Sequence, residues 1–337
     1  MQPYEAVIGD CLSSLVPVGK PVALFDFPTY TNVGDSAIWL GTIDYLSRHR
    51  TTSRILWVGD GSVHDHALPS LPEDCTILIN GGGNFGDIWP SHQVMRERLL
   101  LAYPHNRIIQ LPQSVFFGCQ ATAEDSRLIF SQHRDFHLLL RDEESFAICK
   151  SLYECNVVMC PDMALHLSQL PRSKEPDYDV FALLRTDKER TVGFSAPEGF
   201  DWSFAKADWV EQQAGPFQLT YGIFGEFFSR YPSTARFFTA FRRRLFTSLA
   251  RERLLVGFGL LSRGRVVVTD RLHGHILCTL MGIPHVVLDN NYGKINRFRK
   301  LWNTGTDICH AVPSLSDAYE RVDLLLMSPR STSVISP

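Results

Sequence analysis

The stretch RVVVTDRLHGHILCTLMGIPHVVLD (residues 265–289) joins two β-branched runs through a helical run. We expect strands at 265–270 and 284–289, because apolar runs rich in β-branched residues are typical of strands buried in a parallel sheet. The helix between them is expected to end at Gly282, with Pro284 just beyond it. A strand, a helix and a strand in this order predict a parallel sheet with crossover helices.

The same alternation continues through both halves of the 337-residue chain. Further strands are expected at 21–27, 54–58, 76–80, 107–111, 136–140, 156–160 and 179–185. A polar segment with two prolines, 169–179, separates the halves. The sequence therefore predicts an α/β protein of two Rossmann-like domains, 1–172 and 173–337, that face each other across a cleft. We expect the last helix to pack back on the first domain.

Composition excludes several classes of protein. A net charge of −3 gives no reason to expect nucleic-acid binding, and no run of 18 apolar residues exists to span a membrane. The N-terminus has no basic region followed by an apolar run, so no secretory signal is expected. The eight scattered cysteines contain no C-x-x-C pair, which indicates buried thiols in a reducing compartment. We therefore expect a cytoplasmic protein.

Ligands of open parallel sheets bind beyond the carboxyl ends of the strands, so the loops that follow the strands are informative. In PTYTNVGDSAI (28–38), Asn32, Gly34 and Asp35 lie at a turn that opens a helix. Asp35 has two interpretations. It is either the helix N-cap, or a carboxylate that orients a substrate hydroxyl.

A second loop, INGGGNFGDIW (79–89), contains the pattern G-x-G-x-x-G. A dinucleotide site would place an acidic residue near the end of the next strand, yet no acid occurs between Glu97 and Glu124. The nicotinamide interpretation therefore fails. We expect a loop whose backbone approaches a ligand, such as an anion at the next helix N-terminus. In that helix, Val94 should lie on the apolar side and Arg96 in solvent.

Two further loops carry cations. In LLRTDKE (183–189), Arg185 and Lys188 either bind an anion or form a solvated charged turn. Arg271, His273 and His275 lie in the first turn of the helix in the opening stretch.

The two histidines, His273 and His275, are two positions apart and point in different directions, which disfavours a shared metal. A helix N-terminus that carries Arg271 is an anion site. Gly274 indicates that something packs against the backbone there, and His275 is expected to be structural.

Seven motifs together resemble the polysaccharide pyruvyl transferase family over residues 20–300. They are, in chain order, TNVGDSAI, INGGGNFGD, LPQSVFF, RDEES, CPDMA, LLRTDKE and TDRLHGHILCTLMGIPHVVLDN. The resemblance implies a fold similar to the GT-B type of glycosyltransferase. It also implies transfer of pyruvate from phosphoenolpyruvate to a sugar of an exopolysaccharide or cell-surface glycan precursor, as a cyclic ketal with release of phosphate. No cofactor or metal is expected.

The resemblance, combined with the chemistry of an enol phosphate, suggests roles for individual residues. His273 is the expected acid that protonates the methylene carbon, and Asp35 the expected base or orienting residue. Phosphoenolpyruvate is expected to be bound by Arg271, Arg185, Lys188 and Gly274. Acceptor or loop contacts are expected from Asn32, Gly34, Gly82, Gly83, Asn84 and Gln113. Two alternatives are a GT-B glycosyltransferase with a nucleotide-sugar donor and a carbohydrate-binding protein without activity.

The segment between Glu226 and Glu252 has no acidic residue and interleaves six arginines with phenylalanines. Two interpretations are open for its central part, 227–246. It either lies on the anionic inner face of the cytoplasmic membrane, which would suit a lipid-linked acceptor, or it buries its phenylalanines in the second domain and leaves its arginines outside.

Overall fold

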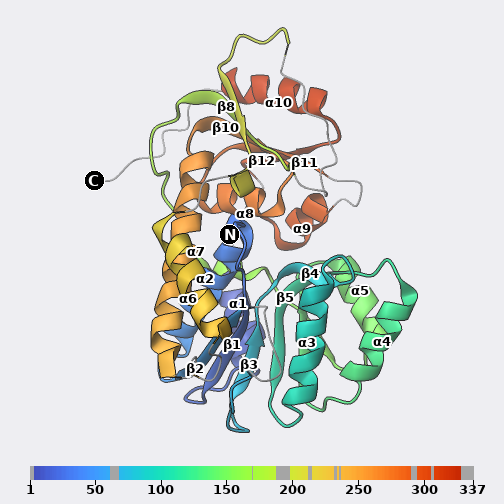
Figure 1. The fold of residues 1–337 in the computed structure, drawn as a ribbon. Helices are drawn as coiled ribbons and strands as arrows, with labels where there is room; N and C mark the ends of the chain where they lie inside the picture. The colour runs from blue at the N-terminus through green and yellow to red at the C-terminus, as the bar shows by residue number, and fades with distance from the viewer. Residues whose placement is uncertain are drawn as a thin grey trace. The chain divides into compact units, whose positions relative to one another are not determined.

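The computed structural model describes residues 4–60, 68–168, 170–186, 198–211, 215–230, 234, 237–289, 294–304 and 307–327. Its internal contacts divide the chain into two compact units, and Figure 1 labels many of their helices and strands. Unit 1 comprises Met1–Ser168 and Gln212–Leu255, and unit 2 comprises Gln169–Glu211 and Val256–Pro337.

The expected domains were 1–172 and 173–337, and the observed units differ from them mainly in the placement of one large segment. Gln212–Leu255 belongs with unit 1, although the sequence suggested the second domain. The physical reason is aromatic packing: the ring of Phe246 stacks on that of Phe27, with 4.2 Å between centroids. Arg253 adds a hydrogen bond of 2.7 Å from Nη1 to the carbonyl oxygen of Pro28.

Unit 1 contains a seven-stranded parallel sheet in the order β2-β1-β3-β5-β6-β7, with β4 paired to β5. Its strands are β1 (Val22–Phe27), β2 (Ile55–Asp60), β3 (Thr76–Ile79), β4 (Gly82–Gly86), β5 (Ile108–Phe116), β6 (Phe136–Leu140) and β7 (Asn156–Met159). All six strands expected in this region are present. Its helices are α1 (Tyr4–Ser13), α2 (Val33–His49), α3 (Pro90–Ala102), α4 (Gln120–Phe130), α5 (Glu143–Leu152), the short η2 (Met163–His166), α6 (Pro216–Arg230) and the first part of α7 (Thr239–Leu261).

The glycine-rich segment that was expected to be a loop forms strand β4. A side chain at Gly86, where φ is 110°, would place its Cβ 1.8 Å from the carbonyl oxygen of Phe116 on β5. Glycine is therefore needed because the backbones of β4 and β5 approach so closely. The sequence did not reveal this strand because it lacks the β-branched residues by which strands are found.

Helix α3 turns a different face to the core from the one expected. Arg96 is completely buried, whereas Val94 is 49% exposed. The guanidinium carbon of Arg96 lies 4.2 Å from the ring centroid of Phe85, and its Nε donates a hydrogen bond of 2.6 Å to Gln110 Oε1. The prediction that Arg96 lies in solvent was wrong, because an arginine can be buried when aromatic and amide groups surround its guanidinium.

Unit 2 contains a five-stranded parallel sheet in the order β12-β11-β10-β8-β9. Its strands are β8 (Tyr178–Leu183), β9 (Phe204–Ala207), β10 (Gly264–Thr269), β11 (His285–Leu288) and β12 (Cys309–Val312). Its helices are α8 (Leu272–Leu280), α9 (Lys294–Trp302), α10 (Leu315–Met327) and the short η3 (Trp209–Glu211). The three expected strands β8, β10 and β11 are present, and β9 and β12 are additional.

The order of strands in unit 2 reverses at β8. The chain adds β9 on one side of β8 and places β10, β11 and β12 on the other, so the switch point lies between β8 and β10. Helix α10 covers this sheet through a cluster that includes Ala318, Val322, Val268 and Val286. This packing within unit 2 corrects the expectation that the last helix returns to the first domain.

Candidate active site

The carboxyl ends of β8, β9 and β10 meet in unit 2 and are tied together by hydrogen bonds. The backbone N–H of Arg185, after β8, donates to Asp270 Oδ1 after β10, at 2.9 Å. The backbone N–H of Thr186 donates to Asp208 Oδ2 after β9, also at 2.9 Å. Two buried carboxylates thus fix the loops at the switch point of the sheet, where ligands of such folds bind.

Arg271 is the N-cap residue of α8, and its side chain is held rigidly. Its Nη2 donates to Asp208 Oδ2 at 2.5 Å, and its guanidinium carbon lies 5.4 Å from the ring centroid of Trp209. The Arg271 and Asp208 side chains are only 5% and 0% exposed. A guanidinium with a fixed plane at a helix N-terminus is suited to an anion that binds in one orientation.

Asp208 was not among the site residues predicted from the sequence. It directly follows β9, as Asp270 directly follows β10. An acidic residue at the end of a short apolar run was therefore the available signal. It was overlooked because β9, FAKA, is too short and too polar at Lys206 to be recognised as a strand.

His273 and Gly274 follow Arg271 in the first turn of α8. His273 is 9% exposed. A side chain on Gly274 would place its Cβ 2.5 Å from Thr269 Oγ1, so what packs against this glycine is β10. Lys188, the remaining residue expected at this site, lies outside the described residues.

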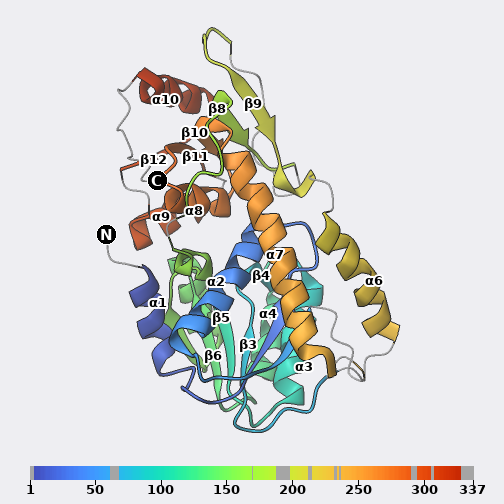
Figure 2. The ribbon, with the colours of Figure 1, turned by 90° about the vertical axis from the view of Figure 1, so that its left-hand side faces the viewer.

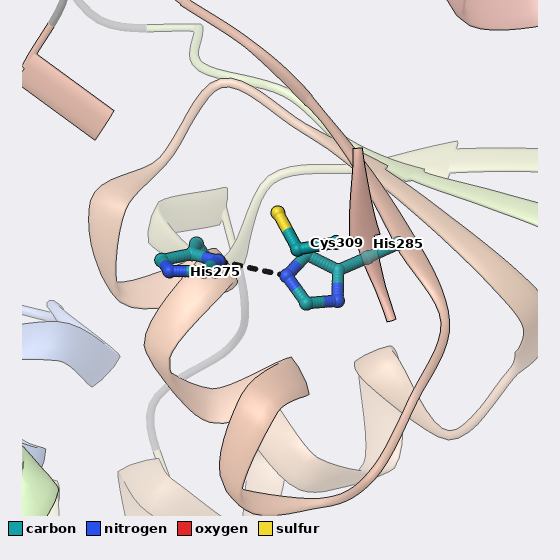
Figure 3. A group of neighbouring side chains, drawn as sticks. All are labelled: His275, His285 and Cys309. Carbon is teal, nitrogen blue, oxygen red and sulfur yellow. Dashed lines mark hydrogen bonds between the residues drawn. The ribbon is translucent and has the colours of Figure 1, made fainter. Parts of the chain in front are cut away.

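His275 lies in a buried group with His285 and Cys309, contributed by α8, β11 and β12 (Figure 3). One ring nitrogen of each histidine, His275 Nδ1 and His285 Nε2, is 2.8 Å from the other. His275 Nε2 is 2.7 Å from Thr304 Oγ1, and His285 Nδ1 is 2.7 Å from the carbonyl oxygen of Ile283. Every ring nitrogen therefore has a hydrogen-bond partner, which accounts for the pair as neutral core residues.

Burial sets the charge of this pair. It lowers the pKa of His275 well below its usual value, with the neighbouring His285 and Arg299 adding to the effect. It also lowers the pKa of His285 to about 4. Both rings are therefore neutral near neutral pH.

Acid is expected to destabilise the protein through these histidines. Below pH ~6.5 these histidines bind protons in the unfolded chain but stay neutral in the folded protein. Their contribution to the free energy of unfolding is therefore fully present above pH ~6.5 and is lost as the pH falls towards 4. The depressed pKa of His285 corresponds to about 3 kcal/mol. Thermal unfolding from pH 7 to 4 should show a shallower loss of Tm for His285→Gln than for the exposed control His105→Gln. Parallel curves for the two variants would contradict this.

At the edge of the unit 1 sheet, the side chain of Asp35 is oriented by two donors. Tyr30 Oη and Asn32 Nδ2 each donate to Asp35 Oδ2 at 2.8 Å. The N-cap of α2 is Asn32, whose Oδ1 accepts from the backbone N–H of Gly34 at 2.9 Å. Asp35 is therefore not the cap, and its second oxygen faces Gly82, where a Cβ would lie 3.1 Å from Oδ1.

Asn84 and Gln113 lie in one buried amide network of unit 1. Gln113 Nε2 donates to Asn84 Oδ1 at 2.5 Å, and Arg96 Nη2 donates to the same oxygen at 3.2 Å. Asn84 Nδ2 donates to Asp26 Oδ2 at 3.0 Å. The exposed Gly83 precedes Asn84 on β4. The network unites residues from four strands or helices, and the sequence did not predict that Asp26 and Arg96 belong to it.

Two of the quoted motifs, RDEES and CPDMA, meet in another buried ion pair of unit 1. Arg141 Nη1 donates to Asp162 Oδ2 at 2.5 Å, and Arg141 Nε donates to Ser114 Oγ at 2.9 Å. Asp162 also caps η2 by accepting from the backbone N–H of Ala164. This pair fixes the ends of β5 and β6 next to Gln113.

Helices α6 and α7, together with the two residues just before α7, place a group of apolar side chains in solvent, and Figure 2 shows the two helices side by side. We call this group the aromatic surface; its members are Ile223, Phe224, Phe227, Phe237, Phe238 and Phe241, between 36% and 73% exposed. Arg243 and Arg244 are exposed beside it, whereas Arg242 and Arg253 are buried. The interpretation with buried phenylalanines and outward arginines is thus wrong for the phenylalanines of the aromatic surface and for Arg242, whereas Phe246 is buried and Arg243 and Arg244 are exposed as it expected. Within the described residues, no helix is both long and apolar enough to cross a membrane.

Residues 32–292 of the chain match the polysaccharide pyruvyl transferase family. The chain belongs to this family. Among its relatives, the Bacillus subtilis (strain 168) protein named "Putative pyruvyl transferase EpsO" is 28% identical over 299 residues, which cover 87% of this chain and 89% of the relative. "Pyruvyl transferase 1" of Schizosaccharomyces pombe is 28% identical over 319 residues, which cover 91% and 76%.

A solved structure is also similar: a functionally uncharacterised protein of Klebsiella pneumoniae, with a TM-score of 0.62 and 19% identity over 93% of this chain and all of that one. This likeness concerns the fold alone. Membership of the pyruvyl transferase family makes the protein a transferase and implies a polysaccharide acceptor. It does not favour the glycosyltransferase alternative.

Proposed function

We propose that this pyruvyl transferase takes its pyruvyl group from phosphoenolpyruvate and forms a cyclic ketal on two hydroxyls of a saccharide. The observation that carries the donor assignment is the buried Arg271 at the N-terminus of α8, held by Asp208 beside His273. Phosphoenolpyruvate carries a carboxylate and a phosphate. Arg271, Arg185 and the backbone N–H groups in the first turn of α8 would bind these anionic groups.

The chemistry requires an acid near the methylene carbon of the donor. C2 of an enol phosphate becomes electrophilic only when C3 takes a proton, and His273, in the first turn of α8 next to Arg271, is the proposed donor because histidine is the side chain that most often serves as a general acid. One sugar hydroxyl then adds to C2. A second hydroxyl then forms its own C–O bond at C2 and displaces phosphate, which leaves with the electron pair of its C–O bond and takes up the proton of that hydroxyl. No step of this sequence needs a cofactor.

We assign acceptor recognition to the polar edge of unit 1. Asp35, Asn32, Asn84 and Gln113 offer oxygen and nitrogen atoms of the kind that bind sugar hydroxyls. Gln113 Oε1 takes no hydrogen bond from any residue in the described part of the chain, and a hydroxyl donor is the group that it lacks. Gly82 lets the backbone of β4 lie close to Asp35, and Gly83 exposes the backbone next to Asn84. The cleft expected from the sequence stays a prediction.

Mass spectrometry of saccharides incubated with the protein and phosphoenolpyruvate tests the proposal. We expect a product heavier by one carboxyethylidene group and the release of one equivalent of phosphate. A parallel incubation with nucleotide sugars should release no nucleotide. Nucleotide release with sugar transfer, and no mass gain from phosphoenolpyruvate, would contradict the proposed function and favour a glycosyltransferase.

We further propose that the aromatic surface lies on the anionic inner face of the cytoplasmic membrane, where a lipid-linked acceptor would be found. Its phenylalanines would enter the headgroup region, and Arg243 and Arg244 would face lipid phosphates.

Sedimentation with phosphatidylglycerol vesicles tests this surface. The double variant Phe237→Ser/Phe241→Ser should bind at least about tenfold more weakly than the wild type, because two aromatic side chains no longer enter the membrane. The matched control Val94→Ser/Leu101→Ser removes two exposed apolar residues from α3 instead and should bind normally. Equal binding of both variants, or binding that is insensitive to salt, would remove the surface from membrane contact.

A further inference from the structure

Asp26, near the end of β1, has a backbone conformation that residues other than glycine rarely adopt. Its φ is 66°, and the pairing of β1 with β2 is irregular between Leu24 and Phe27. Such a conformation costs roughly 1–3 kcal/mol in a residue other than glycine, and it persists where the surroundings require it, often at functional sites. The irregular pairing turns the Asp26 side chain into the polar edge of unit 1, where it is 1% exposed.

Both oxygens of the Asp26 carboxylate are engaged. Oδ1 is 2.8 Å from His92 Nδ1 in the first turn of α3, and Oδ2 accepts from Asn84 Nδ2. The amide of Asn84 cannot be reversed, since its Oδ1 already accepts from Gln113 and Arg96. Nδ1 of His92 also lies 3.0 Å from Asn84 Nδ2, but that amide group already donates to Asp26 Oδ2, and the carboxylate oxygen Oδ1 is the nearer neighbour of Nδ1. A carboxylate only accepts, so the contact with Asp26 assigns the proton of His92 to Nδ1. Its Nε2, on the opposite side of the ring, is left with the lone pair.

The groups around His92 raise its pKa and so make its imidazole more basic. Burial lowers the pKa of His92, but the hydrogen bond to Asp26 and the negative charge of Asp26 raise it by more. Asp35 also raises it, and Arg96 lowers it. The net result is a raised pKa of His92. The rings of Tyr30 and His92 pack edge to face, with 6.2 Å between their centroids.

We propose that His92, held by Asp26, is the general base that deprotonates the acceptor hydroxyl, and that Asp35 orients the sugar. This inference rests on the proposed function and deepens it. Asp35 Oδ2 already accepts from Tyr30 and Asn32, whereas the side chain of His92 is 16% exposed and its Nε2 lone pair is available. A carboxylate that fixes the tautomer of a histidine base is the arrangement found in hydrolase triads.

The proton and electron balance of the step is simple. The O–H bond of the acceptor breaks, and its proton moves to His92 Nε2. The electron pair left on oxygen forms the C–O bond at C2 of phosphoenolpyruvate while C3 receives a proton. The Asp26 carboxylate, hydrogen-bonded to Nδ1, stabilises the imidazolium that forms.

The experiment compares His92→Gln and Asp26→Asn with the wild type. His92→Gln should lower kcat by about 10²–10⁴ and leave phosphoenolpyruvate affinity unchanged. In Asp26→Asn the acid limb of kcat/KM for the acceptor should move to lower pH, because a base must be neutral and His92 loses the carboxylate that raises its pKa. A structural role alone would not move this limb. The His92 ring titration, followed by NMR, should shift in the same direction without any substrate.

The chain offers a matched control in a second histidine–aspartate pair of unit 1. His137 Nε2 lies 2.6 Å from Asp135 Oδ1 at the start of β6. His137→Gln and Asp135→Asn should leave kcat and the pH profile unchanged.

Two results would overturn the inference. In the first, the wild type transfers pyruvate, but His92→Gln has a normal kcat or Asp26→Asn leaves the acid limb unmoved. This result excludes His92 as the base and leaves the proposed function intact. A wild type that transfers nothing from phosphoenolpyruvate, although His92 titrates as described, overturns the proposed function and the base role with it.

Discussion

Replacement of His273 by glutamine is expected to lower pyruvyl transfer by about 10²–10⁴, the contribution of a positioned acid. Glutamine preserves most of the side-chain volume in the first turn of α8 but cannot supply a proton at neutral pH. Phosphoenolpyruvate should still bind, because Arg271 and the helix N-terminus are unchanged. Steady-state kinetics with phosphate detection, and donor binding by calorimetry, measure the two effects separately.

The neighbouring His275 provides the control, since it lies on the same helix but has its own partners in the core. His275→Asn should lower Tm and leave kcat close to that of the wild type. A His273→Gln variant with normal turnover would take His273 out of the chemistry, and a His275→Asn variant that folds but is inactive would question the separation of their roles.

Replacement of Arg271 by alanine should raise KM for phosphoenolpyruvate by about 10–100-fold. The expected loss is that of one charged hydrogen-bonding group, about 1.5–3 kcal/mol. Asp208 would also be left buried without its guanidinium partner, so the variant should lose stability. Arg271→Lys keeps the charge but not the planar fork, and we expect an intermediate KM in a more stable protein.

The control for Arg271 is Arg265, on the same strand–helix unit. Its Nη1 forms an ion pair of 2.8 Å with Asp179, with side chains 37% and 29% exposed. Such a pair contributes about 0–1 kcal/mol, so Arg265→Ala should change neither KM nor Tm appreciably. An unchanged KM in Arg271→Ala, at full occupancy of folded protein, would refute the donor clamp.

The strands were predictable where their side chains are β-branched and buried on both faces. β10 and β11 follow this pattern, while β1 and β8 were recognisable as short runs of apolar, buried residues; the structure contains all four. β4, β9 and β12 do not follow it: β4 is GGNFG, and β9 is FAKA. Their pairing depends on the strands beside them, and a local pattern does not contain that information.

The segment Gln212–Leu255 shows the same limit at the scale of a domain. Its phenylalanines and arginines were visible in the sequence, but their burial was not. Arg242 and Arg253 are buried, because Trp57 and Phe27 of unit 1 provide aromatic rings on which their guanidinium groups pack. Phe237, in contrast, is 73% exposed.

The sequence by itself determined the α/β class, most strands, the family, and the position of Arg271 and His273 at the start of a helix. These follow from local periodicity and from motifs whose residues are close in the chain. Only the tertiary structure decided that Asp208 holds Arg271, and that Asp26, Asn84 and His92 form one network. The partners in these contacts are separated by 8 to 66 residues. Such pairs are brought together by the order of strands in a sheet, which no local pattern specifies.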